Sequence, residues 1–332
     1  MFIIQSYSIA VVCCVVTMLC WGSWPSFSRM NPKWSFEYFY WDYIIGIAII
    51  SIILAFSLGS YGEYGRSFID DISQASWSNL SLAFIGAVIW NIANICIFIA
   101  IQIAGMAVAF PISIGLSVVI GAILNYSVQP DIQSAWFLFS GMFFIVIAII
   151  FDAKAYKLIQ QYRSKSDYTN GIFIAIFSGI LFGIFYLFFA KSMATDLNFP
   201  EQYKITPYTA MVMFAIGAII SNIFLNTYIM KYPKHGDKLS YKEYLNNIKD
   251  HGYGIIAGIL SGLGTYLSFT AFGVAGAAIS YGLGQGSTMI AVLWGLFIWK
   301  EFRNTSSKAH LFIYLMFSFY IIGLILIIIS KV

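Results

Sequence analysis

The chain has 332 residues, of which 60% are hydrophobic and only 10% are charged, and its formal net charge at pH 7 is +4. A soluble domain usually carries charge on about 25% of its residues, so this composition excludes a water-soluble protein. It also excludes a disordered chain and a nucleic-acid-binding protein, because the few basic residues are spread thinly along the sequence.

Apolar stretches about 20 residues long, the length that a helix needs to cross a bilayer, recur along the whole chain. In chain order they predict ten membrane-spanning helices, near residues 7–29, 36–58, 80–103, 105–125, 134–152, 171–193, 206–230, 253–274, 276–299 and 310–330. The polar segments between them are too short to hold a soluble domain. We therefore predict an all-α integral membrane protein.

Lys and Arg residues are concentrated on one side of the predicted bundle. The loops that follow the first, third, fifth, seventh and ninth helices hold 14 of the 18 such residues, and the opposite side, with both termini, holds 4. Cytoplasmic loops of membrane proteins are enriched in Lys and Arg. We therefore expect a multi-pass protein of the cell (inner) membrane with both termini on the extracytoplasmic side.

The two halves of the sequence resemble each other. With a shift of 171 residues, six residues of 98–115 meet identical residues of 269–286, among them Gly105 on Gly276. Because five crossings are an odd number, the second half must be inverted relative to the first, as in many secondary transporters. The expected units are two five-helix repeats and a basic connecting loop, at residues 1–155, 171–332 and 156–170.

Helix-breaking residues occur at matching places in the fourth and ninth predicted helices. Pro111 lies in the fourth, and the shift places it on Gly282, which is followed by Gly284 and Gly286. Paired interruptions of this kind indicate a transport site in carriers built from inverted repeats. Close packing of small residues between helices is the alternative explanation.

Polar and aromatic side chains inside the apolar helices suggest the chemistry of such a site. Amides at membrane depth line cavities or bond to a neighbouring helix, and aromatic rings stack on flat or ring-shaped solutes. Together they favour a small neutral polar solute. The candidate substrate-binding residues are Trp21, Trp24, Asn91, Asn94, Pro111, Ser113, Asn222, Tyr281, Gln285 and Thr288.

Ionisable residues are scarce at membrane depth. No Lys or Arg lies near the centre of a predicted helix, so little is available to neutralise an anionic solute. Asp42, one turn inside the second helix, and Glu301, at the end of the ninth, are the candidates for proton coupling. For Asp42 the simpler alternative is an ion pair with Arg29 or Lys33 near the membrane surface.

The sequence contains no pattern typical of an intramembrane enzyme. The histidines, His235, His251 and His310, lie in or beside loops, and neither a zinc-binding His motif nor a nucleophile elbow is present. We expect no catalytic activity, no metal and no cofactor, with the solute, protons and lipid as partners and no nucleic acid. A drug or amphiphile exporter and a non-transporting membrane scaffold remain alternatives, and the oligomeric state stays open.

Three segments carry a resemblance to known carriers: Cys20-Trp21-Gly22-Ser23-Trp24-Pro25, then Trp41-Asp42-Tyr43, and then the stretch from Asn91 to Tyr126. They resemble the drug/metabolite transporter superfamily, in particular the branch of ureide permeases and of glucose/ribose- and rhamnose-type sugar porters. Lys300-Glu301 is similar to the sugar-symporter pattern. The resemblance implies a proton-coupled, secondary-active carrier of a small neutral metabolite, either a ureide or nucleobase or a sugar.

Overall fold

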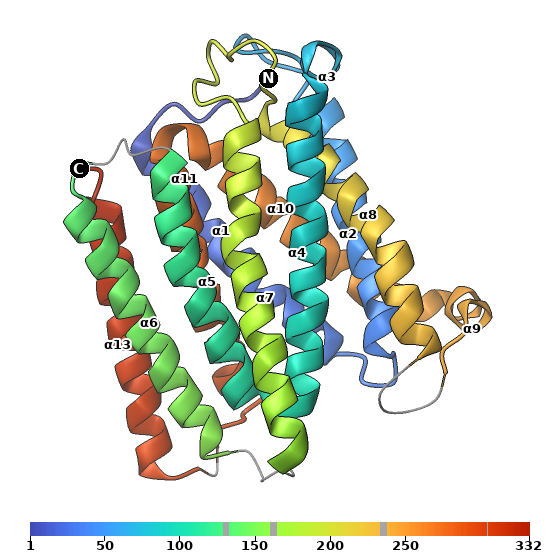
Figure 1. Ribbon diagram of the computed structural model, residues 1–332, viewed down its shortest axis with the longest axis vertical. Helices are drawn as coiled ribbons and strands as arrows, with labels where there is room; N and C mark the ends of the chain where they lie inside the picture. The colour runs from blue at the N-terminus through green and yellow to red at the C-terminus, as the bar shows by residue number, and fades with distance from the viewer. Residues whose placement is uncertain (129–132, 160–164, 233–237, 304) are drawn as a thin grey trace.

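The computed structural model describes residues 1–128, 133–159, 165–232, 238–303 and 305–332. Within these residues the chain forms a bundle of long helices (Figure 1). Ten helical segments are long and apolar enough to cross a membrane by length and composition. The prediction of an all-α protein with ten spans is therefore confirmed.

The helices follow one another with short connections. The first half of the chain contains α1 (Tyr7–Ser28), α2 (Phe36–Phe56), the short α3 (Phe68–Gln74), α4 (Trp77–Ala104), α5 (Met106–Val128) and α6 (Ala135–Lys157). The second half contains α7 (Lys165–Ser192), α8 (Pro207–Lys231), the short α9 (Tyr241–Asn246) and η1 (Ile248–Asp250), α10 (His251–Ala275), α11 (Ala277–Gly284), α12 (Ser287–Leu293), the π-helix η2 (Trp294–Ile298) and α13 (Ser307–Ile329).

Among the described residues, five of the long helices begin directly after a serine, and four of these serines cap their helix. The hydroxyl oxygens of Ser6, Ser35, Ser76 and Ser306 accept a hydrogen bond from the backbone N–H three residues further along. Such a bond satisfies one of the N–H groups that the start of a helix leaves without an internal partner. The apolar runs that follow then remain helical, because every backbone polar group in lipid needs a partner within the protein.

The two sets of five helices make matching contacts. α4 packs along α7 and α8, as α10 packs along α1 and α2, and α5 packs on α7 as α12 packs on α1. α6 pairs with α13, and α2 with α8. This exchange of partners agrees with the predicted inverted repeat. The boundary at residues 156–170 stays a prediction, and residues 160–164 of that loop lie outside the described residues.

Gly105 and Gly276, which the sequence shift superimposes, separate consecutive helices in the same conformation. Gly105, between α4 and α5, has φ 85° and ψ 154°, and Gly276, between α10 and α11, has φ 89° and ψ 157°. Each N–H donates a 2.9 Å hydrogen bond to the carbonyl four residues earlier, that of Ile101 or Phe272. Only glycine adopts this combination of angles without strain.

The interruptions differ in one respect from those expected. α5 runs through Pro111 without a break, although a proline beyond the first turn removes one hydrogen bond of the helix. In the second half, α11 ends at Gly284 and α12 begins at Ser287, so the chain is interrupted at Gln285 and Gly286. The glycine-rich string of the ninth span therefore does mark a discontinuous helix.

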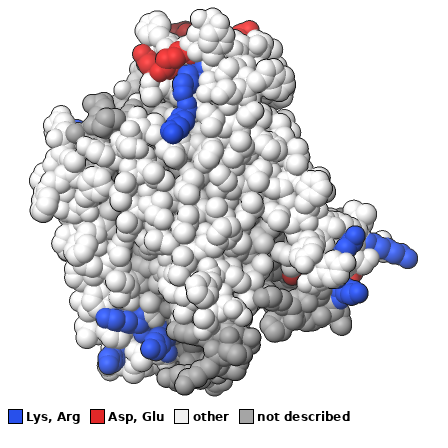
Figure 2. Space-filling view, viewed as in Figure 1, with Lys and Arg blue, Asp and Glu red and all other residues white. Residues whose placement is uncertain are grey.

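Charge is distributed unevenly between the two ends of the bundle. Both termini lie at one end (Figure 1). On the face in Figure 2, most Lys and Arg side chains lie at the other end, and the visible acidic side chains gather mainly beside the termini. We call the end that holds both termini the termini end. The opposite end, which we call the basic end, includes Arg29, Lys154, Lys231 and Lys300.

Candidate functional site

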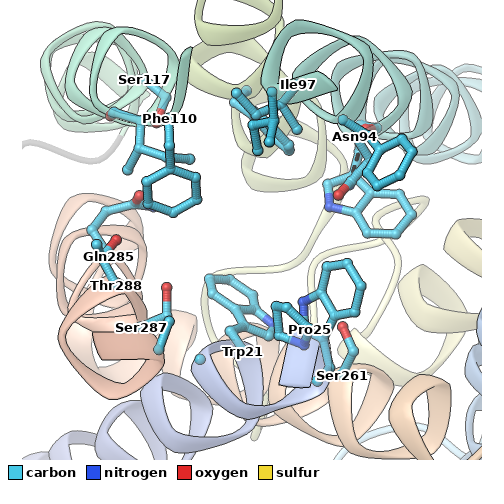
Figure 3. A pocket seen from close by; sticks show the side chains of 18 of the residues that line it. Trp21, Pro25, Asn94, Ile97, Phe110, Ser117, Ser261, Gln285, Ser287 and Thr288 are labelled. Carbon is cyan, nitrogen blue, oxygen red and sulfur yellow. Dashed lines mark hydrogen bonds between the residues drawn. The ribbon is translucent and has the colours of Figure 1, made fainter. Parts of the chain in front are cut away.

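A cavity of about 280 Å³ lies between helices of both halves (Figure 3). Its wall includes Ser28, Phe36 and Met106, which lie at the ends of α1, α2 and α5, so the cavity reaches the basic end. Within the described part of the chain, no Asp, Glu, Lys or Arg lines it. The polar lining residues, apart from aromatic ones, are Ser28, Asn94, Ser117, Ser261, Thr265, Gln285, Ser287 and Thr288.

Two tightly held tryptophans form one side of the cavity. Trp21 lies between α10 and α11, where a Cβ at Gly284 would come within 2.6 Å of its ring and a Cβ at Gly264 within 3.0 Å. Its Nε1 donates a hydrogen bond to Thr265 Oγ1 at 3.2 Å. Trp24 packs on Tyr43, with ring centroids 4.4 Å apart. The glycines thus allow α10 and α11 to approach the indole closely, and they fix its ring at the cavity wall.

Aromatic side chains close the cavity toward the termini end. The Tyr281 hydroxyl donates to the Ser117 carbonyl at 2.9 Å, which fastens α11 to α5. Behind its ring, Tyr186 lies with its centroid 5.5 Å away, and Phe189 stacks on Phe269 at 4.7 Å. All of these side chains are buried. The cavity is therefore reached from the basic end and blocked at the other.

Two amides face the cavity with unused hydrogen-bonding capacity. Figure 3 shows Asn94 and Gln285 on opposite sides of it. Among the described residues, each amide makes one hydrogen bond, to the carbonyl four residues earlier, at 3.3 Å for Asn94 and 3.5 Å for Gln285. Because an amide offers two donor hydrogens and an acceptor oxygen, both side chains can bind a solute.

Six of the ten candidate substrate-binding residues line this cavity: Trp21, Trp24, Asn94, Tyr281, Gln285 and Thr288. Asn91 instead accepts a bond from Tyr40 (2.6 Å) and donates to Ser221 (2.8 Å), which joins α2, α4 and α8. Ser113 donates to Ser178 at 3.0 Å, which joins α5 and α7. Their part in solute binding stays a prediction.

Asn222 and Pro111 also lie outside the lining. Asn222 is fully buried, and neither polar atom of its amide has a hydrogen-bond partner among the described residues. The candidate residues leave out five serine and threonine residues of the lining: Ser117, Ser28, Ser261, Thr265 and Ser287. The 171-residue shift places Ser117 on Thr288, so the repeat itself contained the signal for the first of them.

Asp42 is buried away from the cavity and is well supplied with donors. Its Oδ2 accepts from Trp34 Nε1 at 3.0 Å, and its Oδ1 lies 2.6 Å from both the Tyr244 hydroxyl and His251 Nδ1. Burial, together with the neighbouring Asp42 carboxylate, raises the pKa of Tyr244. The acid is therefore paired with His251 rather than with Arg29 or Lys33. His235 lies outside the described residues.

Glu301 lies at the basic end, where it pairs with Arg29, one of the two residues considered as partners of Asp42. Its Oε1 forms an ion pair with Arg29 of α1, and its Oε2 accepts a 3.0 Å hydrogen bond from the Tyr156 hydroxyl of α6. The ion pair joins the ends of two spans beside the mouth of the cavity. A role in proton coupling stays a prediction for Glu301 and for Asp42.

Comparisons with known proteins agree with this arrangement. The sequence pattern of the ureide permease family matches residues 39–170 and 157–330. Ureide permease 1 of Arabidopsis thaliana is 24% identical to this chain, and the match covers 97% of each of the two proteins. Ureide permease 3 of the same plant is 26% identical over 84% of this chain and 89% of its own.

More distant similarities extend beyond plants. A Lactococcus lactis protein whose name proposes sugar uptake is 21% identical over 77% of this chain and 82% of its own. A solved crystal structure with 12% sequence identity matches with a TM-score of 0.60, over 95% of this chain and 97% of its own. At that identity the match shows a shared fold and nothing further.

Proposed function

Because this chain belongs to the ureide permease family, a family of membrane transporters and not of enzymes, we propose that it is a secondary-active, proton-coupled carrier of a small neutral polar solute. The observation that carries the proposal is the uncharged cavity between the two halves, which reaches the basic end and holds two amides on opposite walls. Protons are the proposed coupling ion.

The lining supports a neutral, flat or ring-shaped solute. An anion or a cation would leave water without finding an opposite charge, and that desolvation costs several kcal/mol. The indoles of Trp21 and Trp24 offer faces for stacking, while Asn94 and Gln285 can pair with donors and acceptors on the edge of a ring. A ureide or a nucleobase has this combination of a flat ring and a polar edge.

A sugar is the second candidate. Its hydroxyl groups can pair with the same amides, and its apolar face can lie on an indole. The distant relative from L. lactis, named for sugar uptake, is the specific observation in its favour. The cavity volume of about 280 Å³ lies at the lower end of the range for small-molecule sites and supports a compact metabolite over a drug-sized amphiphile.

The proposed orientation places the basic end in the cytoplasm and both termini outside. Cytoplasmic enrichment of Lys and Arg supports it. In this orientation the cavity faces inward, and the layer around Tyr281 and Phe269 separates it from the outside. Alternating access then requires that layer to open while the basic end closes, as expected for two repeats that move around a shared site.

Uptake into proteoliposomes tests the proposal. Labelled uracil, allantoin, glucose, ribose and rhamnose are compared with and without an inward proton gradient, and empty liposomes serve as the control. We expect one chemical class to accumulate above its outside concentration only when the gradient is present. Equilibration that ignores the gradient would contradict proton coupling, and absence of transport or binding of every solute would favour a scaffold.

A further inference from the structure

A second cluster of ionisable groups, with a buried carboxyl at its centre, lies near the basic end where α6 and α13 pack together. At its centre is Asp152 of α6, which is 2% exposed. Among the described residues, its Oδ1 has no hydrogen-bond partner. An ionised carboxylate with an unpartnered oxygen costs several kcal/mol in such a site, whereas a neutral carboxyl costs much less. The surroundings of Asp152 therefore favour a bound proton.

The groups around Asp152 come from its own helix and from distant parts of the chain. Glu301 interacts with it electrostatically, as does the Tyr156 hydroxyl one turn further along α6. Arg29 of α1 supplies a positive charge, but it pairs with Glu301. The guanidinium of Arg29 therefore compensates the charge of Glu301. The lysines of the region, Lys154 and Lys308, lie over phenylalanine rings instead.

Tyr320 of α13 connects this cluster to the cavity. Its side chain is fully buried, and its hydroxyl has no hydrogen bond of good geometry among the described residues. The same hydroxyl interacts with Thr288 on one side and electrostatically with Asp152 on the other. Thr288 lines the cavity. Tyr320 therefore interacts both with a residue of the cavity wall and with the buried acid of α6.

The backbone next to Glu301 has an unusual form that allows this approach. A Cβ at Gly295, in the π-helix η2, would lie only 2.6 Å from Glu301 Oε2 and 3.3 Å from the Tyr156 hydroxyl. The glycine thus leaves space for the carboxylate against the helix. π-Helical turns inside α-helices frequently occur at functional sites.

We propose that Asp152 is the proton-binding group of the transport cycle and that Tyr320 couples its protonation to the occupied cavity. The proposal rests on the proton-coupled transport proposed above. When the O–H bond of Asp152 breaks, the proton leaves for water at the basic end, and the new carboxylate repels the carboxylate of Glu301.

The decisive variant is Asp152→Asn, which keeps the shape of a neutral carboxyl and cannot release a proton. In proteoliposomes that contain a pH-sensitive dye, wild type should carry protons inward whenever solute enters. The variant should bind solute and exchange labelled for unlabelled solute as wild type does. Its proton flux and its gradient-driven accumulation should both fall to background. Asp70→Asn, which changes an exposed acid of α3, is the matched control. It should leave the proton flux and the gradient-driven accumulation of solute unchanged.

Tyr320→Phe provides a second test that does not alter either acid. It should lower proton-coupled uptake severalfold and shift its pH profile, whereas Tyr314→Phe on the exposed face of the same helix should alter neither. An unchanged profile for Tyr320→Phe, or proton flux at the wild-type rate in Asp152→Asn, would overturn the assignment. If wild type itself moves solute without protons, the proposed coupling fails instead, so the two failures are distinguishable.

Discussion

The pair of glycines that separate α4 from α5 and α10 from α11 leads to a quantitative prediction. Gly105→Ala and Gly276→Ala each place a Cβ on a residue with φ near +85° to +89° and ψ near +155°. This region of backbone angles is accessible almost only to glycine. A residue forced into it costs about 1–3 kcal/mol. Each variant should therefore be destabilised by that amount, relative to wild type.

Because the two sites belong to different halves of the bundle, their effects should add, to about 2–6 kcal/mol in the double variant. Gly252→Ala is the matched control. A Cβ there would meet no atom within 4 Å, and the residue lies in the first turn of α10. Its replacement should be neutral or should stabilise the helix by up to about 1 kcal/mol.

Thermal unfolding in detergent, followed by tryptophan fluorescence, measures the difference between the variants. The midpoints of Gly105→Ala and Gly276→Ala should fall clearly below those of wild type and Gly252→Ala, with the double variant lowest. If either single variant has the same unfolding midpoint as Gly252→Ala, that glycine does not need its positive φ. The interpretation of the two glycines as paired helix breaks is then wrong at that position.

Three further predictions concern single side chains. Asp71→Ala should destabilise the protein by about 3–5 kcal/mol, as judged by the same unfolding assay, because the buried carboxylate accepts bonds from the N–H and hydroxyl of Thr206 at the start of α8. Gly121→Ala should cost about 1–3 kcal/mol and weaken solute binding in a thermal-shift titration, since its Cβ would lie 2.2 Å from the ring of Tyr281. Tyr244→Phe should be less stable than wild type at neutral pH, where its bond to a buried carboxylate is lost. Because burial raises the pKa of this tyrosine, its contribution is complete below about pH 10 and declines above it, so the difference in midpoint between the two proteins should shrink in alkaline buffer.

The sequence predicted the spans and the repeat because both depend on local properties of the chain. Span length follows from bilayer thickness, and the shift of 171 residues superimposed Gly105 on Gly276 before their angles were known. α5 continues through Pro111, so the interruption expected there is absent, whereas the ninth span is interrupted at Gln285 and Gly286. Six candidate residues line the cavity, and they include both amides that face it.

What the sequence did not predict depends on which helices become neighbours. Asn91 and Asn94 lie three residues apart, yet one bonds to other helices and the other faces the cavity. No pattern along a single helix separates these roles. Asp42 meets a histidine 209 residues away. Asp152 interacts with Glu301 and with Tyr320 of α13. Such partners are fixed only by the packing of the bundle.

The central claim is that the cavity between the two halves binds the transported solute. Equilibrium binding of the solute identified by uptake, measured with the purified protein, tests it most directly. Wild type and Asn198→Ala, an exposed control, should bind one molecule with the same affinity, whereas Asn94→Ala/Gln285→Ala should bind at least about tenfold more weakly because polar groups of the solute lose their partners. Equal affinity in all three proteins, together with normal folding, would contradict the claim.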